Sequence, residues 1–386
     1  MLVHGLPWLS TATQSEIDAA VNPLWYLHMS HAAVLLFFIT SGYVIALTNQ
    51  GPFSGSAANR YVQRRCLRIV PIYLIAILAG WLAYRPVSAS NLLENIFFLQ
   101  NGAWGIEPLA GNRPVWSLHF EMVYYAGFLL VWAFRPKVLP IFCAALFFGA
   151  ADWFFGGPLS ILGGWSIGAI FWLLGAFIAW NGSTATSPRV LGFVLLTYAT
   201  NHLWPGVILM NKLGLPYAGS AALSMTDLAL LPGAVAIFCG VTRITFPGLR
   251  QLGWLALAIP IGACLLLFAL GRLWENTRWE MASVATVMGV PMLWCERENW
   301  GEAVFKCFRP FGKISYGLYL FHVPGVTLVR YLCPGSGGPI GYAAKIALWL
   351  GVTIGAAWIC ELKIQPMLVS LHRRFKGPPA VQTAPT

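Results

Sequence analysis

Apolar residues along this chain are grouped into long runs separated by short polar stretches. A helix that crosses a bilayer needs about 20 mostly apolar residues, and runs of this kind recur eleven times. The pattern predicts an all-α fold, namely a polytopic membrane helical bundle of about 11 transmembrane helices. The expected spans are 29–48, 69–84, 115–134, 138–156, 158–180, 190–210, 222–241, 251–271, 281–295, 314–330 and 340–360.

Composition supports a single membrane domain. Of the 386 residues, 58% are hydrophobic and 10% are charged, whereas soluble domains carry about 25% charged residues. We expect the membrane domain to cover residues 1–365 and a basic, disordered tail to cover residues 366–386. The net charge of +11 is spread between apolar runs. This distribution indicates topology signals among membrane lipid and argues against a nucleic-acid partner.

The basic residues predict how the helices are oriented. Alternate loops on one side hold 17 of the 24 lysines and arginines, and the opposite side holds 7. By the positive-inside rule the first side is cytoplasmic, so we expect a multi-pass protein of the inner (plasma) membrane with a cytoplasmic C-terminus. Met1–Leu9 looks like the end of an apolar helix. With that first span restored, the bundle would have 12 helices.

Glu121 is the strongest candidate for chemistry. It lies about two turns into the predicted span 115–134, and a carboxylate at membrane depth suggests function by default. The alternative is that Glu121 pairs with an arginine or histidine and only holds helices together. His119 precedes Glu121 by two residues and therefore points to another side of the helix. We expect His119 to make a helix–helix hydrogen bond.

An arginine cluster marks the start of the second expected span. Arg65 and Arg68 are three residues apart, so they share a helix face, and Arg60 and Arg64 lie close by. Guanidinium groups match phosphate geometry in a bidentate manner, which suggests a site for a phosphorylated donor. The alternative is ordinary anchoring to anionic lipid.

The histidines offer further candidates. His322 lies within the span 314–330, directly before Val323 and Pro324, and a structural role is as plausible there as a catalytic one. We interpret His31 and Asp227 as interfacial residues near span ends. His4 stands alone in the sequence.

Four ordered motifs resemble those of acyltransferase family 3, the multi-span membrane acyltransferases that decorate bacterial surface glycans and other acceptors. The resemblance covers residues 1 to about 365, and no motif is specific by itself. The motifs are Phe37-Phe-x-x-Ser-Gly-Tyr43, Arg65-x-x-Arg68-Ile-x-Pro-x-Tyr73, Trp116-Ser-Leu-x-x-Glu121-x-x-x-Tyr125 and Ile314-Ser-Tyr-x-x-Tyr-Leu-x-His322.

The resemblance implies a mechanism. Acyl-CoA, with acetyl-CoA as the expected donor, would bind from the cytoplasm, with Arg65 and Arg68 on its phosphates. His4, which matches a first-span histidine of the family, would act as general base or briefly carry the acyl group. Glu121 would orient or charge-balance that histidine, or accept a proton from the acceptor hydroxyl. The family's first span also carries an arginine that would lie before residue 1. No metal is required.

Two other classes of protein remain open. A proton-coupled transporter or flippase of a glycan precursor also uses intramembrane carboxylates and histidines, but the sequence contains no inverted repeat. A scaffolding membrane protein would leave the motifs unrelated to chemistry. For an O-acetyltransferase type of enzyme, the acceptor could be a polysaccharide, a lipid-linked sugar, a glucan or a small molecule.

Overall fold

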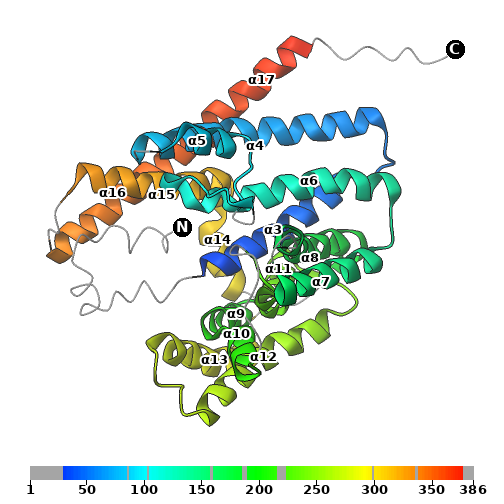
Figure 1. Cartoon of the computed structure of the whole chain (residues 1–386), viewed down its shortest axis with the longest axis vertical. Coiled ribbons are helices and arrows are strands. Elements are labelled where there is room, and N and C mark those ends of the chain that lie inside the picture. Colours follow the sequence, from blue (N-terminus) through cyan, green and yellow to red (C-terminus); the bar gives the residue numbers. More distant parts are fainter. Residues whose placement is uncertain are drawn as a thin grey trace.

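Helices make up nearly all of the described part of the chain. The computed structural model describes residues 29–84, 87–101, 104–156, 160–184, 189–214, 223–297, 300–334 and 338–376. Within these residues, strand is limited to β1 (Ser183–Thr184) and β2 (Ile244–Thr245), which pair antiparallel. The expected all-α fold is therefore confirmed, and Figure 1 shows helices throughout the molecule.

Eight helical segments in the described part of the chain are long and apolar enough to cross a membrane. The fold is therefore a polytopic membrane bundle, as predicted. These segments contain α3 (Ser30–Thr48), α4 (Gly55–Ala83), α6 (Trp116–Phe134), α7 (Val138–Phe155), α8 (Ser160–Asn181), η5 (Met225–Leu230) with α11 (Leu231–Thr242), α12 (Leu249–Ala269) and α16 (Gly338–Ile359).

The other three expected spans are also helical. They correspond to α9 (Leu191–Leu203) with α10 (Pro205–Lys212), to α13 (Thr277–Cys295) and to α15 (Ser315–Leu332). A continuous helix over 190–210 was expected, but the structure breaks it at Trp204, whose φ of 48° is left-handed. The reason is the following proline, which disfavours the α conformation at the residue before it and begins the next helix.

The C-terminal segment also differs from the expectation. Residues 365–376 form helix α17 (Gln365–Lys376), which continues from α16 through the π-helical turn η6 (Cys360–Ile364). They are therefore helical rather than disordered. Pro366 lies two residues after the π-helical turn, and local adjustments of this kind let a membrane helix tolerate a proline. Residues 377–386 lie outside the described part. In Figure 1, α17 extends away from the bundle at the top.

Three shorter or connecting elements complete the described fold. One end of the bundle is shaped by α5 (Ala89–Ile96) and by the 3₁₀-helix η3 (Ala110–Val115), which leads into α6. The amphipathic α14 (Trp300–Gly312) leads into α15.

Helices α3 and α6 run in the same direction. Near their starts, His31 stacks on Trp116, and near their ends the Trp132 indole N–H donates to the carbonyl of Gly51 at 2.8 Å. Arg135, directly after α6, also donates to Gly51 O, at 3.0 Å. We call the end of the bundle that holds Gly51 and Arg135 the basic end.

The serine–glycine motif allows α3 to pack closely on α8. A Cβ added at Gly42 would lie 1.9 Å from the carbonyl oxygen of Trp172, which is far inside van der Waals contact. Gly175 makes the reciprocal approach, because its Cβ would lie 2.0 Å from Ile39 O. Two glycines, one on each helix, therefore set the distance between these helices.

Gly42→Ala should destabilise the protein because the clash is with backbone, which cannot rotate away. Overpacking a well-packed interior costs about 1–3 kcal/mol, so we expect a lower Tm in detergent and less inserted protein. Gly127→Ala is the matched control, since a Cβ there meets nothing within 4 Å. Equal Tm values for the two variants would contradict the packing argument.

Candidate active site

Glu121 is buried where α3 and α6 meet. Its side chain accepts a hydrogen bond from Ser41 Oγ at 3.0 Å, and the Tyr125 hydroxyl donates to the same carboxylate oxygen. The residue is only 3% exposed. The structure thus joins two of the motifs, the serine–glycine pair of α3 and the W-S-L-x-x-E segment of α6.

Arg65 is the basic residue associated with the Glu121 cluster. Its guanidinium lies 5.8 Å from the Tyr61 ring centroid and 5.6 Å from that of Tyr125, and it interacts electrostatically with Glu121. No direct ion pair joins Arg65 and Glu121 among the described contacts. Arg65 therefore lies against the aromatic rings of the Glu121 cluster, where cation–π contact favours an arginine.

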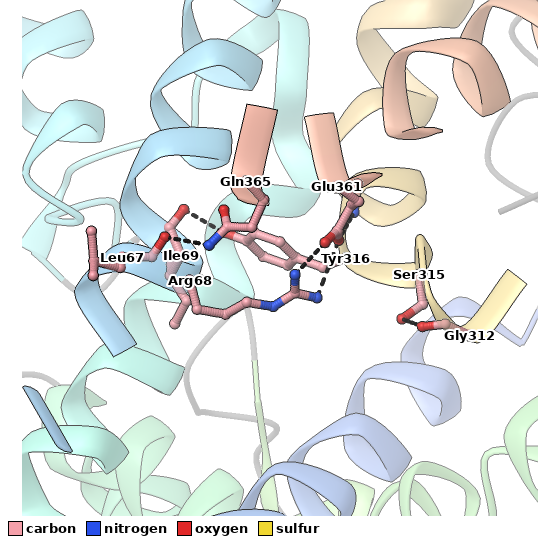
Figure 2. A network of polar contacts seen from close by, with 9 residues as sticks. Leu67, Arg68, Ile69, Gly312, Ser315, Tyr316, Glu361 and Gln365 are labelled. Atoms are coloured by element: carbon pink, nitrogen blue, oxygen red, sulfur yellow. Dashed lines mark hydrogen bonds and ion pairs between the residues drawn. The ribbon is translucent and has the colours of Figure 1, made fainter. Parts of the chain in front are cut away.

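Arg68 has a different partner, which the sequence analysis missed. Its guanidinium forms a two-pronged ion pair with Glu361 of η6, with Nη2 at 3.3 Å from Oε1. The Glu361 side chain is fully buried and also accepts from the backbone N–H of Gly317 at 3.0 Å. Figure 2 shows Arg68 reaching from α4 to Glu361 across the face of Tyr316.

A signal for Glu361 was present in the sequence. It is an acidic residue directly after the last apolar run, in a segment otherwise rich in basic residues. Its pairing with an arginine almost three hundred positions earlier, however, needs the tertiary structure. As a result, Arg65 and Arg68 differ in environment: Arg65 faces the Glu121 cluster and Arg68 faces η6.

Pro71 and Pro324 each leave a backbone carbonyl free to accept a hydrogen bond from another segment. Pro71 has no N–H, so the carbonyl of Leu67, four residues earlier, loses its helical partner. Gln365 Nε2 donates to that carbonyl at 2.6 Å (Figure 2). The carbonyl four residues before Pro324 likewise accepts from Asn112 Nδ2, at 3.0 Å. Each proline thereby ties its helix to a distant segment.

The W-S-L-x-x-E and I-S-Y motifs are also joined. Ser117 Oγ and the Tyr319 hydroxyl lie 2.7 Å apart, and the same hydroxyl donates to the carbonyl of Pro114. The Tyr316 hydroxyl donates to Ile69 O, in the arginine motif, at 3.1 Å. All four motifs therefore converge on the α3–α4–α6–α15 region.

His119 faces away from Glu121, as predicted. Its Nδ1 donates to the carbonyl of Phe98 at 2.6 Å. Its Nε2 accepts from the Trp165 indole at 2.9 Å and lies 3.1 Å from Asn101 Nδ2. Both ring nitrogens are thus occupied by neighbouring segments. The prediction that His119 makes hydrogen bonds between elements is confirmed.

A cavity of about 710 Å³ lies beside this region. Its walls include His31 from α3, Trp116 from α6, and Tyr319 and His322 from α15. His322 is buried, and its Nδ1 donates to Tyr319 O at 2.5 Å. Glu121 does not line this cavity. Of the predicted catalytic residues in the described part, His322 is the one on its wall.

His31 and Asp227, which we interpreted as interfacial, form a pair. The His31 Nε2 atom lies 2.9 Å from Asp227 Oδ1. Asp227 belongs to η5, where its Oδ2 also accepts from the backbone N–H of Ser224 at 2.7 Å. The two residues are far apart in sequence, and no pattern in the chain indicates that they meet.

His4 lies outside the described residues. The predicted approach of His4 to Glu121 therefore stays a prediction. Within the described ranges, no group of three or more His, Cys, Asp and Glu side chains is placed to hold a metal ion.

A second, basic cavity of about 390 Å³ lies between α4 and α17. We call it the basic groove. It is lined by Arg60, Gln63, Arg64, Leu67, Arg68, Gln365, Val369, His372 and Arg373. No acidic residue is among these lining residues, so the groove is suited to an anion.

Comparison with known proteins identifies the family. The family model described as an acyltransferase domain, that of acyltransferase family 3, matches residues 1–362. The chain therefore belongs to acyltransferase family 3 and is a multi-pass membrane acyltransferase. No curated protein and no solved structure matches the chain significantly.

Proposed function

We propose that this acyltransferase moves an acyl group, acetyl in the first instance, from acyl-CoA to a hydroxyl of a glycan or related acceptor. The observation that supports this proposal most directly is the cavity of about 710 Å³. Two histidines and three tyrosines line it, and three of the four motifs contribute residues to its wall. We further propose that the protein lies in the inner membrane with its basic end and C-terminus in the cytoplasm, in keeping with the distribution of basic residues.

The donor's phosphates are proposed to bind at the basic end. Arg68, one of the two arginines that the family resemblance assigns to acyl-CoA, lines the basic groove, and its side chain is 42% exposed despite the ion pair with Glu361. Arg60 and Arg373 add cations from two different helices. Guanidinium groups hold phosphates with two parallel hydrogen bonds. Arg65 lies beside Tyr61 and is proposed to extend the same positive field inward.

The chemistry requires a base and a way to manage charge. The acceptor oxygen attacks the acyl carbonyl carbon while a base takes its proton, and the CoA sulfur leaves. An imidazole suits this role because its pKa lies near neutrality. The family resemblance gives this role, or that of acyl carrier, to His4, and His322 is the alternative on the cavity wall. Glu121 is proposed to act from the adjacent buried cluster as the charge-balancing group.

Labelled acetyl-CoA supplied to membranes tests the reaction class. We expect label to be recovered in an envelope glycan extract, together with free CoA in equal amount. The competing function, transport or flipping of a glycan precursor, predicts movement of the precursor without CoA release. Acetyl-CoA that neither binds nor turns over would contradict the proposed function.

Arg60→Ala combined with Arg373→Ala should weaken acetyl-CoA binding. Neither arginine makes a hydrogen bond or ion pair within the described part of the chain, so their loss leaves no buried group unpaired. A hydrogen bond to a charged group is worth about 1.5–3 kcal/mol, so we expect an affinity loss of about 10-fold or more. Binding of radiolabelled acetyl-CoA to purified protein measures it.

Lysine replacements at the same two positions should recover only part of the affinity, because an ammonium cannot form two parallel bonds. Arg272→Ala is the matched control, since Arg272 is exposed and pairs with Glu275 away from the groove. Unchanged affinity in the double Ala variant would remove the basic groove from the donor site.

A further inference from the structure

The His31–Asp227 pair has the arrangement of an oriented proton acceptor. Asp227 is held from two sides, because Ser224 N–H donates to Oδ2 at 2.7 Å while His31 Nε2 lies 2.9 Å from Oδ1. On the other side, the imidazole stacks on Trp116 with 6.2 Å between ring centroids and 20° between planes. A carboxylate behind one ring nitrogen fixes the tautomer and orientation of a histidine.

The free side of this imidazole faces the cavity. The His31 side chain is 33% exposed, although its Nε2 atom is buried and lies at ion-pair distance from Asp227, outside hydrogen-bond geometry. His31 lines the cavity of about 710 Å³, so Nδ1 is the ring nitrogen that a substrate can reach. A histidine with a purely structural role between α3 and η5 would not need a side of its ring exposed to the cavity.

The pair lies near the end of the bundle opposite the basic end. His31 is in the first turn of α3, Trp116 begins α6, and Asp227 is in η5, while the basic groove lies beside α17. Other ionisable or charged groups on the cavity wall are Tyr84, Arg113, Tyr316, Tyr319, His322 and Arg330. No carboxylate is among the cavity-lining residues. Asp227 reaches this cavity through its contact with His31.

We propose that His31, oriented by Asp227, removes the proton from the acceptor hydroxyl during acyl transfer. This proposal rests on the proposed function. The acceptor oxygen forms a bond to the acyl carbon and the thioester C–S bond breaks. The hydroxyl proton passes to His31 Nδ1 and then to the departing sulfur, giving an ester and CoA thiol. His4 lies outside the described residues and takes no part in this step.

The test separates chemistry from structure through two replacements of His31. His31→Gln keeps an N–H that can contact Asp227 but cannot accept a proton, and His31→Ala leaves space for added imidazole. General acid–base catalysis contributes about 10²–10⁴-fold. We therefore expect both variants to lose about 100-fold or more in kcat while binding acetyl-CoA normally. Imidazole should restore part of the activity of His31→Ala.

Asp227→Asn is the partner variant. Asp227 is the N3 residue of a capping box whose N-cap is Ser224. The amide oxygen of asparagine can still accept from the backbone N–H of Ser224 while the charge is lost, so kcat should fall with little change in acetyl-CoA affinity. The matched control is Glu275→Gln, which breaks an exposed ion pair, Arg272 Nε to Glu275 Oε2 at 2.8 Å, and should leave activity unchanged.

The possible outcomes separate the two hypotheses. Wild-type protein that neither binds nor turns over acetyl-CoA would remove the proposed function itself. An active wild type whose His31→Gln variant keeps near-normal kcat would overturn the role of His31 and make the pair a structural tie. If His31→Ala fails to insert into membranes, His31→Gln and Asp227→Asn decide the question alone.

Discussion

Replacing Glu121 by Gln should lower acyl transfer by about 100-fold or more, the usual size of a general acid–base contribution. The amide keeps the shape of the side chain, and its oxygen can still accept from Ser41 Oγ and the Tyr125 hydroxyl. What is lost is the negative charge that balances Arg65. The measurement is transfer of labelled acetyl groups in membranes, normalised to the amount of inserted protein.

The effect should fall on kcat, because Glu121 does not line the cavity and lies apart from the basic groove. Glu107→Gln is the matched control, since Glu107 is an exposed carboxylate and its loss should leave transfer unchanged. Near-normal transfer by Glu121→Gln would make Glu121 a structural residue. The chemistry would then rest on the two histidines of the cavity wall, His31 and His322.

Much of the bundle could be predicted because a bilayer forces each spanning segment to satisfy its own backbone hydrogen bonds. Apolar run length therefore located every helix that now counts as a candidate span. The break at Trp204 differs from the continuous helix that we expected. It could also have been predicted, because Pro205 follows Trp204 directly. We nevertheless predicted a continuous helix from the apolar pattern, because membrane helices often tolerate proline.

Part of the site could be predicted for a similar reason. A carboxylate at membrane depth costs free energy, so the position of Glu121 alone indicated either a functional role or a charged partner. Its actual partners, Ser41 and Tyr125, belong to motifs that the sequence already contained, although only the fold joins Ser41 to it.

The two long-range ion pairs could not be predicted, because each depends on two residues that meet only after folding. Glu361 lies almost three hundred residues after Arg68 and forms an ion pair with it. Asp227 contacts His31, which the sequence suggested was only interfacial, and orients its imidazole. Neither pair leaves a periodic or local pattern in the sequence.

Arg68→Met should strongly destabilise the protein, and more than Glu361→Gln does. Without Arg68, the fully buried Glu361 carboxylate keeps, among the described residues, only the N–H of Gly317 as a partner. Removing one member of a buried ion pair costs about 3–5 kcal/mol. Because Arg68 itself is 42% exposed, we expect a loss near the lower end of that range, seen as a large drop in Tm in detergent.

The double variant Arg68→Met with Glu361→Gln should recover most of the lost stability, since replacing both members of a buried pair by uncharged groups is often neutral. Glutamine can still accept from the N–H of Gly317. Recovery of folding without recovery of acetyl-CoA affinity would separate the structural role of Arg68 from its proposed role at the donor phosphates. A single Arg68→Met variant with wild-type Tm would show that the ion pair with Glu361 contributes nothing to the fold, and the argument from its burial would fail.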